Sequence, residues 1–317
     1  MVFIVMSVYN WETYLLEQLM SIYYQNYENR FLIIVNDWST DSSWKIAENF
    51  VKNYNLEDKV RIITKENWWV NSAVTVWLEE LKRITDVYSD DILVAYCDSD
   101  DVWTREKLSV QVDYMKSHPD CDISYHDMVC IDKDWILINS SLHKNWYHDD
   151  SFPYLSMISP HIWSTEMVFR SKYIDDIMPL PIWHGMYQDY RTNLVVSLLG
   201  WKYAFIDEKL GSYRQWHVSL STPSEDSSWR KQYHFMDISM FIREMSDRDW
   251  GNPYLTNLQK RFPDKDLSYE ISYCRDMIKY DSLVYRYFVI LFKYPKVFFL
   301  WLKVLLYKMW KSVSLKW

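Results

Sequence analysis

The sequence predicts an α/β protein with a mostly parallel, doubly wound sheet and helices on both faces. Apolar runs rich in Val, Ile and Phe alternate with segments of helical periodicity along the first part of the chain. Two of these runs end abruptly on carboxylates, as strands do where an open parallel sheet carries its ligands. With 49% hydrophobic and 25% charged residues, the 317-residue chain can bury one large core and carry an appendage.

The predicted elements follow one another in βα order. The first strand starts at Val2 and the second helix ends near Tyr54. The remaining strands are expected at Phe31–Val35, Val60–Thr64, Ile92–Cys97 and Ile123–Asp132, and the other helices at Thr13–Gln25 and Asn71–Val87.

The fourth strand ends on three carboxylates within four positions, namely Asp98, Asp100 and Asp101. Crowded hard oxygen ligands attract Mg²⁺ or Mn²⁺, and a divalent ion there suits a diphosphate. The alternative is an acidic turn that caps a helix beginning near Arg105.

Several motifs occur together with this one, in a fixed order. In that order they resemble glycosyltransferase family 2, the inverting transferases with the GT-A fold, over roughly residues 1–222. The motifs are Ser7-Val-Tyr-Asn10, Val35-Asn-Asp-Trp-Ser-Thr-Asp41, Glu66-Asn67, Asp98-Ser-Asp-Asp101, Trp163-Ser-Thr-Glu-Met-Val-Phe169, Gln188-Asp189-Tyr190 and Tyr213-Arg214-Gln215.

The resemblance implies a domain plan. Residues 1–222 form the GT-A domain, with a nucleotide-sugar half at 1–104 and an acceptor half at 105–222. We expect a helical C-terminal appendage, made of an extension at 223–281 and a tail at 282–317.

The resemblance also implies roles for individual residues. Asp100 is expected to be the direct ligand of Mn²⁺ or Mg²⁺, with Asp98 contacting ribose or metal and His217 completing the site. Asp37 matches a carboxylate that hydrogen-bonds the base, and Tyr9 an aromatic that packs against it. The full donor-binding set is Ser7, Tyr9, Asn10, Asp37, Asp98 and Arg214, the last to pair with phosphate.

The acceptor side is expected around Asp189, which aligns with the family's general base. A carboxylate in a desolvated cleft can take the proton of an attacking hydroxyl. Asp189 could at the same time be the N-cap of a helix from Tyr190 to Leu199. Trp103, Trp163 and Gln188 are the expected acceptor-binding residues.

The expected activity is metal-assisted, inverting transfer of a sugar from a nucleotide-diphosphate donor to a hydroxyl of a glycan or lipid-linked acceptor, in cell-envelope polysaccharide assembly. The motifs around Asp189 and Arg214 lean toward rhamnosyltransferase-like members. The alternatives are a sugar-nucleotide pyrophosphorylase-like nucleotidyltransferase and a non-catalytic nucleotide- or glycan-binding protein.

Charge is unevenly distributed along the chain. The net charge is −8, yet residues 282–317 contain seven Lys or Arg and no Asp or Glu. The acidic remainder argues against nucleic acid as a partner. The tail predicts a basic amphipathic segment on an anionic membrane, or else a helix packed on protein. Scattered cysteines and the absence of a signal-peptide pattern predict a cytoplasmic protein, peripheral on the inner face of the cell membrane.

Glycine is unusually rare and tryptophan unusually common. The chain has 4 Gly and 18 Trp, whereas ordinary usage of about 7% predicts roughly 22 Gly. We hypothesise that many of these Trp codons are UGA, read as glycine under a variant genetic code; the alternative is a naturally Trp-rich protein. The positions where the family usually carries Gly are Trp11, Trp38, Trp69, Trp77, Trp135, Trp163, Trp201 and Trp216.

Overall fold

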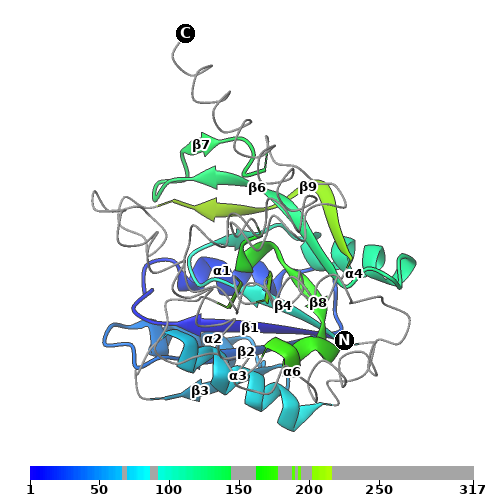
Figure 1. Cartoon of the computed structure of the whole chain (residues 1–317). Helices are drawn as coiled ribbons and strands as arrows, with labels where there is room; N and C mark the ends of the chain where they lie inside the picture. Colours follow the sequence, from blue (N-terminus) through cyan, green and yellow to red (C-terminus); the bar gives the residue numbers. More distant parts are fainter. Residues whose placement is uncertain are drawn as a thin grey trace, which may run out of the picture. The chain divides into compact units, whose positions relative to one another are not determined.

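The computed structural model describes residues 1–65, 70–85, 92–143, 162–177, 188–189, 192–193 and 202–215. The predicted segments 223–281 and 282–317, and also His217, lie outside these ranges. All the elements below belong to one compact unit, made of Met1–His148, Ile162–Thr192 and Lys202–Glu225. Figure 1 follows the chain through them.

The first part of the chain has the βα order that the sequence predicts. Strand β3 has the predicted bounds, and the helices are shorter than predicted at one or both ends. The elements are β1 (Val2–Val8), α1 (Leu15–Tyr23), β2 (Arg30–Asn36), α2 (Ser43–Asn53), β3 (Val60–Thr64), α3 (Val70–Ile84) and β4 (Leu93–Cys97).

The second part contributes further strands and short helical turns. The elements are β5 (Val102–Trp103), α4 (Lys107–Ser117), β6 (Ile123–Ile131), β7 (Leu137–Asn139), the 3₁₀ turn η1 (Ser164–Glu166), β8 (Val168–Arg170), the 3₁₀ turn η2 (Ser171–Tyr173), α6 (Ile174–Ile177) and β9 (Tyr203–Arg214).

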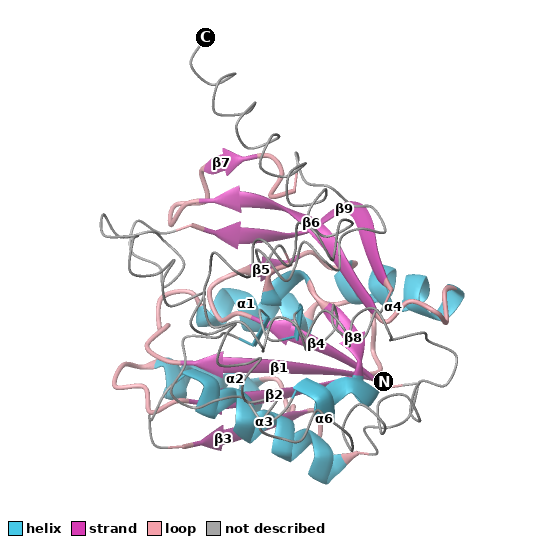
Figure 2. Cartoon of the chain, viewed as in Figure 1, coloured by secondary structure: helices cyan, strands magenta, loops and turns pink. Residues whose placement is uncertain are grey.

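The strands form one sheet in the order β3-β2-β1-β4-β8-β6-β9-β5, and β7 pairs with β6. Strands β1 to β4 are parallel, which confirms the predicted α/β class. Strand β8 is antiparallel to both of its neighbours, β4 and β6. Figure 2 shows β6 and β9 side by side, and these two strands are again parallel. The mostly parallel sheet therefore continues into a mixed part that the sequence does not predict.

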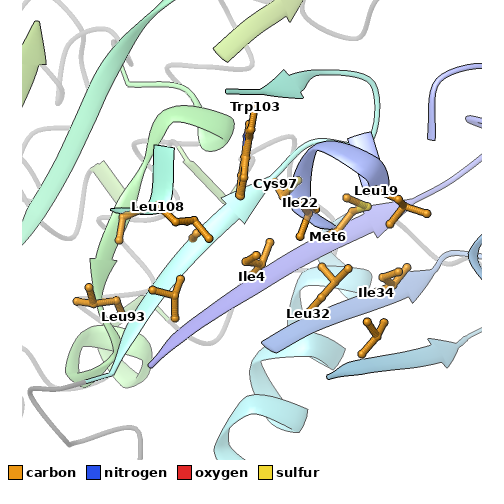
Figure 3. Close-up of a cluster of buried hydrophobic side chains, with 14 of the residues drawn as sticks. Ile4, Met6, Leu19, Ile22, Leu32, Ile34, Leu93, Cys97, Trp103 and Leu108 are labelled. Carbon is orange, nitrogen blue, oxygen red and sulfur yellow. The ribbon is translucent and has the colours of Figure 1, made fainter. Parts of the chain in front are cut away.

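Helices cover both faces of the parallel strands. On one face, Ile4 and Met6 of β1 meet Leu19 and Ile22 of α1 in a buried cluster that also takes in Leu108 of α4 (Figure 3). The buried residues of α1 recur every three or four positions, as they do in an amphipathic helix.

The opposite face carries α3. Trp77 of this helix is buried and packs against Tyr96 of β4, with ring centroids 5.4 Å apart. Tyr96 in turn contacts Phe169 of β8 at 5.0 Å. Aromatic packing thus joins α3 to the point where the sheet changes from parallel to antiparallel pairing.

Within the described ranges, no helix is both long enough and apolar enough to cross a bilayer.

Candidate active site

The predicted donor-binding residues include three that lie at or just after the carboxyl ends of three neighbouring strands. Ser7 lies near the end of β1, Asp37 follows β2, and Asp98 follows β4. Because these strands are parallel and adjacent, their carboxyl ends meet at the same edge of the sheet. In open α/β sheets, this edge is where ligands bind. The fold therefore brings together residues that are far apart in the sequence.

Hydrogen bonds join the loops that follow β1 and β2. Oδ1 of Asn10 accepts the Thr40 backbone N–H at 2.8 Å, and the Asn10 N–H donates to Ser39 Oγ at 3.2 Å. The backbone of Asn10 is left-handed, with φ of 58°. Tyr9, the predicted base-packing aromatic, is 47% exposed. The two loops thus form one bonded surface beside an open aromatic ring.

Asp37 has a partner that the sequence analysis missed. Its side chain is nearly buried and forms an ion pair with Lys65, which directly follows β3. Burial raises the pKa of the Asp37 carboxyl, and the hydrogen bond and charge of Lys65 partly offset this rise. The available signal was position, because Lys65 stands at the carboxyl end of the next parallel strand.

Two tryptophans at family glycine positions have the backbone conformation that glycine favours. Trp38, in the loop after β2, has φ of 61°, and Trp135, in the β6–β7 turn, has φ of 64°. Bulky side chains rarely adopt positive φ. Trp77, a third such position, instead fills the core on helix α3. Local geometry thus favours glycine at two of these positions and accommodates tryptophan at another.

The loop 98–101, here called the acidic loop, follows β4, and its first residue, Asp98, is half-buried. The hydroxyl of Ser164, on η1, lies 2.8 Å from Oδ1 and 2.6 Å from Oδ2 of this carboxylate. Burial raises the pKa of Asp98, and the hydrogen bond from Ser164 lowers it in part. One hydroxyl therefore contacts both carboxylate oxygens.

Asp101 does not cap the following helix, so the alternative interpretation of the acidic turn as a helix cap is wrong for this residue. Helix α4 begins six residues later at Lys107, and a side chain from another part of the chain, Gln25, accepts the backbone N–H of Leu108 in its first turn at 3.0 Å. Oδ1 of Asp101 instead accepts the backbone N–H of Arg214 at 2.9 Å, which ties the acidic loop to the end of β9. Burial, followed by the charges of Asp100 and Asp98, raises the pKa of Asp101 well above its usual value.

Arg214 was predicted to pair with phosphate, and the structure places its guanidinium among protein groups. The residue is 1% exposed. Its Nη2 lies 2.7 Å from Oε2 of Glu17 on α1, and its Nε donates to the Asp100 carbonyl at 2.9 Å. Its guanidinium also stacks on Tyr14, 4.3 Å from the ring centroid. These contacts hold the backbone of the acidic loop. The side chain of Asp100 remains half-buried.

The predicted acceptor residues occupy different environments. Trp103 is 3% exposed and donates its indole N–H to Thr165 Oγ1 at 3.1 Å, so the structure places it in the core. Trp163 is half-buried and packs against Tyr213, with ring centroids 5.4 Å apart. Trp163 is therefore the one of these two that lies at the surface.

Gln188 and Asp189, the third acceptor residue and the predicted base, both lie in a helical turn and are both half-buried. Thr192 Oγ1 donates to the Gln188 carbonyl at 2.7 Å and also lies 2.8 Å from the Tyr96 hydroxyl. Because Tyr96 is two residues before Asp98, this turn is tied to the strand that leads into the acidic loop.

A cluster of buried polar side chains joins η1 to helix α4, and the sequence analysis missed it. His143 forms an ion pair with Glu166 of η1. Lys107 Nζ lies 2.7 Å from Oε1 of Gln111 and 4.1 Å from the centroid of the Trp103 ring. Burial lowers the pKa of Lys107 to about 7. Scattered polar residues on apolar helix and strand faces were the only sequence signal.

The donor set of the acidic loop fits a divalent cation bound together with a diphosphate. Mg²⁺ and similar ions are often held by one or two carboxylates plus substrate phosphates. Asp98 and Asp100 are two half-buried carboxylates at the carboxyl end of β4. Among the described residues, no three His, Cys, Asp or Glu side chains converge to form a complete metal site. The remaining ligands would therefore have to come from the substrate or from other parts of the chain.

Comparison with known proteins identifies the family. The model of "Glycosyl transferase family 2" matches residues 3–178, which is more than half of the chain. The chain belongs to glycosyl transferase family 2. Family membership favours a transferase over the nucleotidyltransferase and the non-catalytic alternatives. The family resemblance read from the motifs is thus confirmed.

The chain has relatives among bacterial glycosyltransferases. It is 23% identical to glycosyltransferase GlyA of Streptococcus pneumoniae over 69% of the chain and 31% of GlyA. It is 30% identical to the Escherichia coli enzyme WfaP, a UDP-Glc:alpha-D-GlcNAc-diphosphoundecaprenol beta-1,3-glucosyltransferase, over 43% of the chain and 49% of WfaP. The chain thus spans less than half the length of these relatives.

Solved structures show the same GT-A fold. TarS 1–349 of S. aureus, in complex with UDP-GlcNAc, matches with a TM-score of 0.55 and 16% identity, over 76% of this chain and 66% of that one. The mannosyltransferase PcManGT of Pyrobaculum calidifontis, in complex with GDP-Man and Mn²⁺, matches with a TM-score of 0.54 and 14% identity. The match covers 98% of this chain and 83% of that one. At these identities the likeness shows the fold alone.

Proposed function

We propose that this glycosyltransferase transfers a sugar, with inversion, from a nucleotide-diphosphate donor to a hydroxyl of a glycan or lipid-linked acceptor. The observation that carries the proposal is the convergence of Asp37, Asp98 and Asp100 at the carboxyl ends of adjacent parallel strands. This edge offers separate polar groups for a base, a ribose and a diphosphate. Neighbours of the same fold bind UDP-GlcNAc and GDP-Man, which supports this donor class.

The donor would lie across the joined loops after β1 and β2. Tyr9 is exposed enough to stack on a base, and Asp37 would accept a hydrogen bond from it. Lys65 holds the Asp37 carboxylate in place through their ion pair. Ser7 and Asn10 complete this end of the site, and Arg214 holds the acidic loop through the hydrogen bond to the Asp100 carbonyl.

Asp100 and Asp98 would hold Mn²⁺ or Mg²⁺. When bound, such an ion stabilises the negative charge that develops on the diphosphate leaving group. His217 is a further proposed ligand and lies outside the described residues. The protein's own contribution is to present two carboxylates on a loop whose backbone is fixed by Arg214.

Asp189 would be the general base. The acceptor hydroxyl gives its proton to the Asp189 carboxylate as its oxygen bonds to the anomeric carbon. The bond from that carbon to the diphosphate oxygen breaks, and the nucleoside diphosphate leaves with the electron pair. Attack from the face opposite the leaving group inverts the anomeric centre. Support comes from the family match and from the link of this turn to β4 through Thr192 and Tyr96.

The acceptor is proposed to be an intermediate of polysaccharide biosynthesis. WfaP acts on a diphosphoundecaprenol-linked sugar, and another relative is a putative teichuronic acid biosynthesis glycosyltransferase. We further propose that the segment 282–317 holds the enzyme on the inner face of the membrane, near such an acceptor, because its seven basic residues are unopposed by acidic ones. Trp163 and Gln188 would contact the acceptor.

Two substitutions test the assignment. Asp100→Asn should remove Mn²⁺-dependent nucleotide binding, measured by calorimetry with UDP or GDP, and should abolish transfer. Asp189→Asn should bind nucleotide normally while turnover falls by roughly 10² or more. Asp113→Asn, an exposed carboxylate on α4, is the control and should match wild type in both assays. Full transfer by either site variant would contradict its assigned role.

A further inference from the structure

The turn η1 is built to present one hydroxyl to the acidic loop. Ser164, the first residue of η1, is 4% exposed, and its Oγ lies 2.8 Å and 2.6 Å from the two oxygens of Asp98. The pair is separated by 66 positions in the chain. A serine hydroxyl has a single proton, so this is one donor shared between two acceptors.

The turn itself is held at several points. The Glu166 carboxylate accepts the Trp163 backbone N–H at 2.8 Å and so closes the turn on itself. Gln111 Nε2 donates to the Glu166 carbonyl at 3.0 Å, and Trp103 Nε1 donates to Thr165 Oγ1 at 3.1 Å. All of these anchors except Trp163 are buried, so the position of the Ser164 hydroxyl is set by the core.

Contact with both oxygens has a geometric consequence. A hydroxyl that reaches both oxygens of a carboxylate lies on the side where a cation or a guanidinium would bind in bidentate fashion. It also fixes the rotation of the carboxylate about its own axis. The lone pairs that remain point away from Ser164, and each can serve one ligand at a time.

We propose that Ser164 is a positioning residue for donor binding, which fixes the Asp98 carboxylate and reserves its outer lone pairs for single contacts with the donor. The inference rests on the function proposed above, in which Asp98 meets the donor through its ribose or through the metal ion bound to its diphosphate. Ser164 acts through Asp98 and touches no substrate itself. The buried Glu166 and its partner His143 anchor the turn from the side of the core.

Three single variants provide the first test. Ser164→Ala should weaken binding of UDP or GDP in the presence of Mn²⁺ about tenfold, in line with the loss of one charge-assisted hydrogen bond. The donor KM should rise by a similar factor, while the acceptor KM stays unchanged. Ser164→Thr keeps the hydroxyl and should restore binding. Ser124→Ala, which removes another buried hydroxyl that bonds Gln111, is the control and should leave nucleotide binding unchanged.

A double-mutant cycle with Asp98→Asn separates the possible outcomes. If Ser164 acts through Asp98, then Ser164→Ala should add less than a twofold loss of binding in the Asp98→Asn background. An equal loss in both backgrounds would overturn the proposal, even if Ser164→Thr does not fold. Loss of binding in Asp98→Asn alone, with Ser164→Ala unchanged, would reject the positioning role and retain the donor site. Normal binding by Asp98→Asn would reject the proposed function itself.

Discussion

The ammonium group of Lys65 lies directly against the carboxylate of Asp37, and the side chains are only 12% and 7% exposed. Removal of one partner leaves a charge that is poorly solvated, which costs more than the intact pair contributes. We therefore expect Lys65→Met to lower the free energy of unfolding by about 1–3 kcal/mol, and to weaken nucleotide binding because Asp37 loses its fixed position. Chemical denaturation and calorimetry measure the two effects.

The control for this prediction is Lys59→Met. Lys59 is 57% exposed and pairs with Glu28 at 3.6 Å, so its contribution should be close to zero. The double variant Lys65→Met/Asp37→Asn should regain part of the lost stability, because it removes the unpaired charge. Equal stability of the Lys65→Met and Lys59→Met variants would show that the Asp37 pair contributes nothing.

The buried Lys107 predicts how the free energy of unfolding depends on pH. Its folded pKa of about 7 lies below the usual value because of burial, and an unfolded lysine titrates near 10.4. Between these values the unfolded chain binds a proton that the folded chain lacks, so the free energy of unfolding rises with pH. The free energy of unfolding of Lys107→Met minus that of wild type should therefore be greatest near pH 6. This difference should fall by roughly 1–3 kcal/mol by pH 9.5, because only wild type gains stability as the pH rises.

Thermal unfolding of both proteins across this pH range provides the measurement. Lys116→Met, an exposed lysine on the same helix, is the matched control and should keep a constant difference from wild type. A pH-independent difference for Lys107→Met would mean that Lys107 stays charged in its buried site.

Trp38 combines a positive φ of 61° with 53% exposure, so its side chain gains little from burial. A left-handed backbone costs a residue with a Cβ about 1–2 kcal/mol. Trp38→Gly should therefore raise the free energy of unfolding by about 1 kcal/mol, although glycine usually lowers it. Denaturant titration checks the sign.

Trp44 on α2 is the control, because Trp44→Gly places glycine in a helix and should cost about 1 kcal/mol. The coding DNA provides a separate test of the decoding hypothesis. UGA codons at Trp38 and Trp135 would establish that the natural residues are glycines, whereas UGG at both would end the hypothesis.

The basic tail predicts salt-sensitive membrane binding. The seven cations of this segment, which contains no Asp or Glu, should each contribute about 1 kcal/mol near an anionic surface. The intact chain should therefore pellet with phosphatidylserine vesicles, remain in solution with phosphatidylcholine vesicles, and dissociate in part at high salt. A chain that ignores anionic vesicles would show that residues 282–317 serve another purpose.

Local sequence patterns predicted the first half of the fold well. Strand β3 has the predicted bounds, and β4 starts at Leu93 instead of Ile92. Helix α1 is shorter than the predicted Thr13–Gln25, because apolar periodicity does not show where terminal turns stop bonding. Strand β8 was not predicted, because its three residues are too few to show a periodic pattern of apolar side chains. It lies between β4 and β6 in the sheet, although it follows both in the chain.

The candidate site was predictable where residues follow strand ends, and less so where partners come from distant segments. Asp37, Asp98 and Asp100 lie at the sheet edge that their motifs indicate. The Ser164 hydroxyl and the Lys65 ammonium could not be matched to their carboxylates without the strand order. Arg214 has a motif typical of phosphate binding, yet its burial beside Glu17 depends on how β9 meets α1.

The bond between Arg214 and Asp101 spans 113 positions of the chain. A ribosome releases the acidic loop long before the end of β9, so the growing chain has all the loop carboxylates but lacks the arginine that fixes their backbone. Such distant contacts form late, because a large loop must close first. A nascent chain that ends before residue 214 would thus carry an acidic loop without its support, and the donor site would become competent only after β9 has joined the sheet.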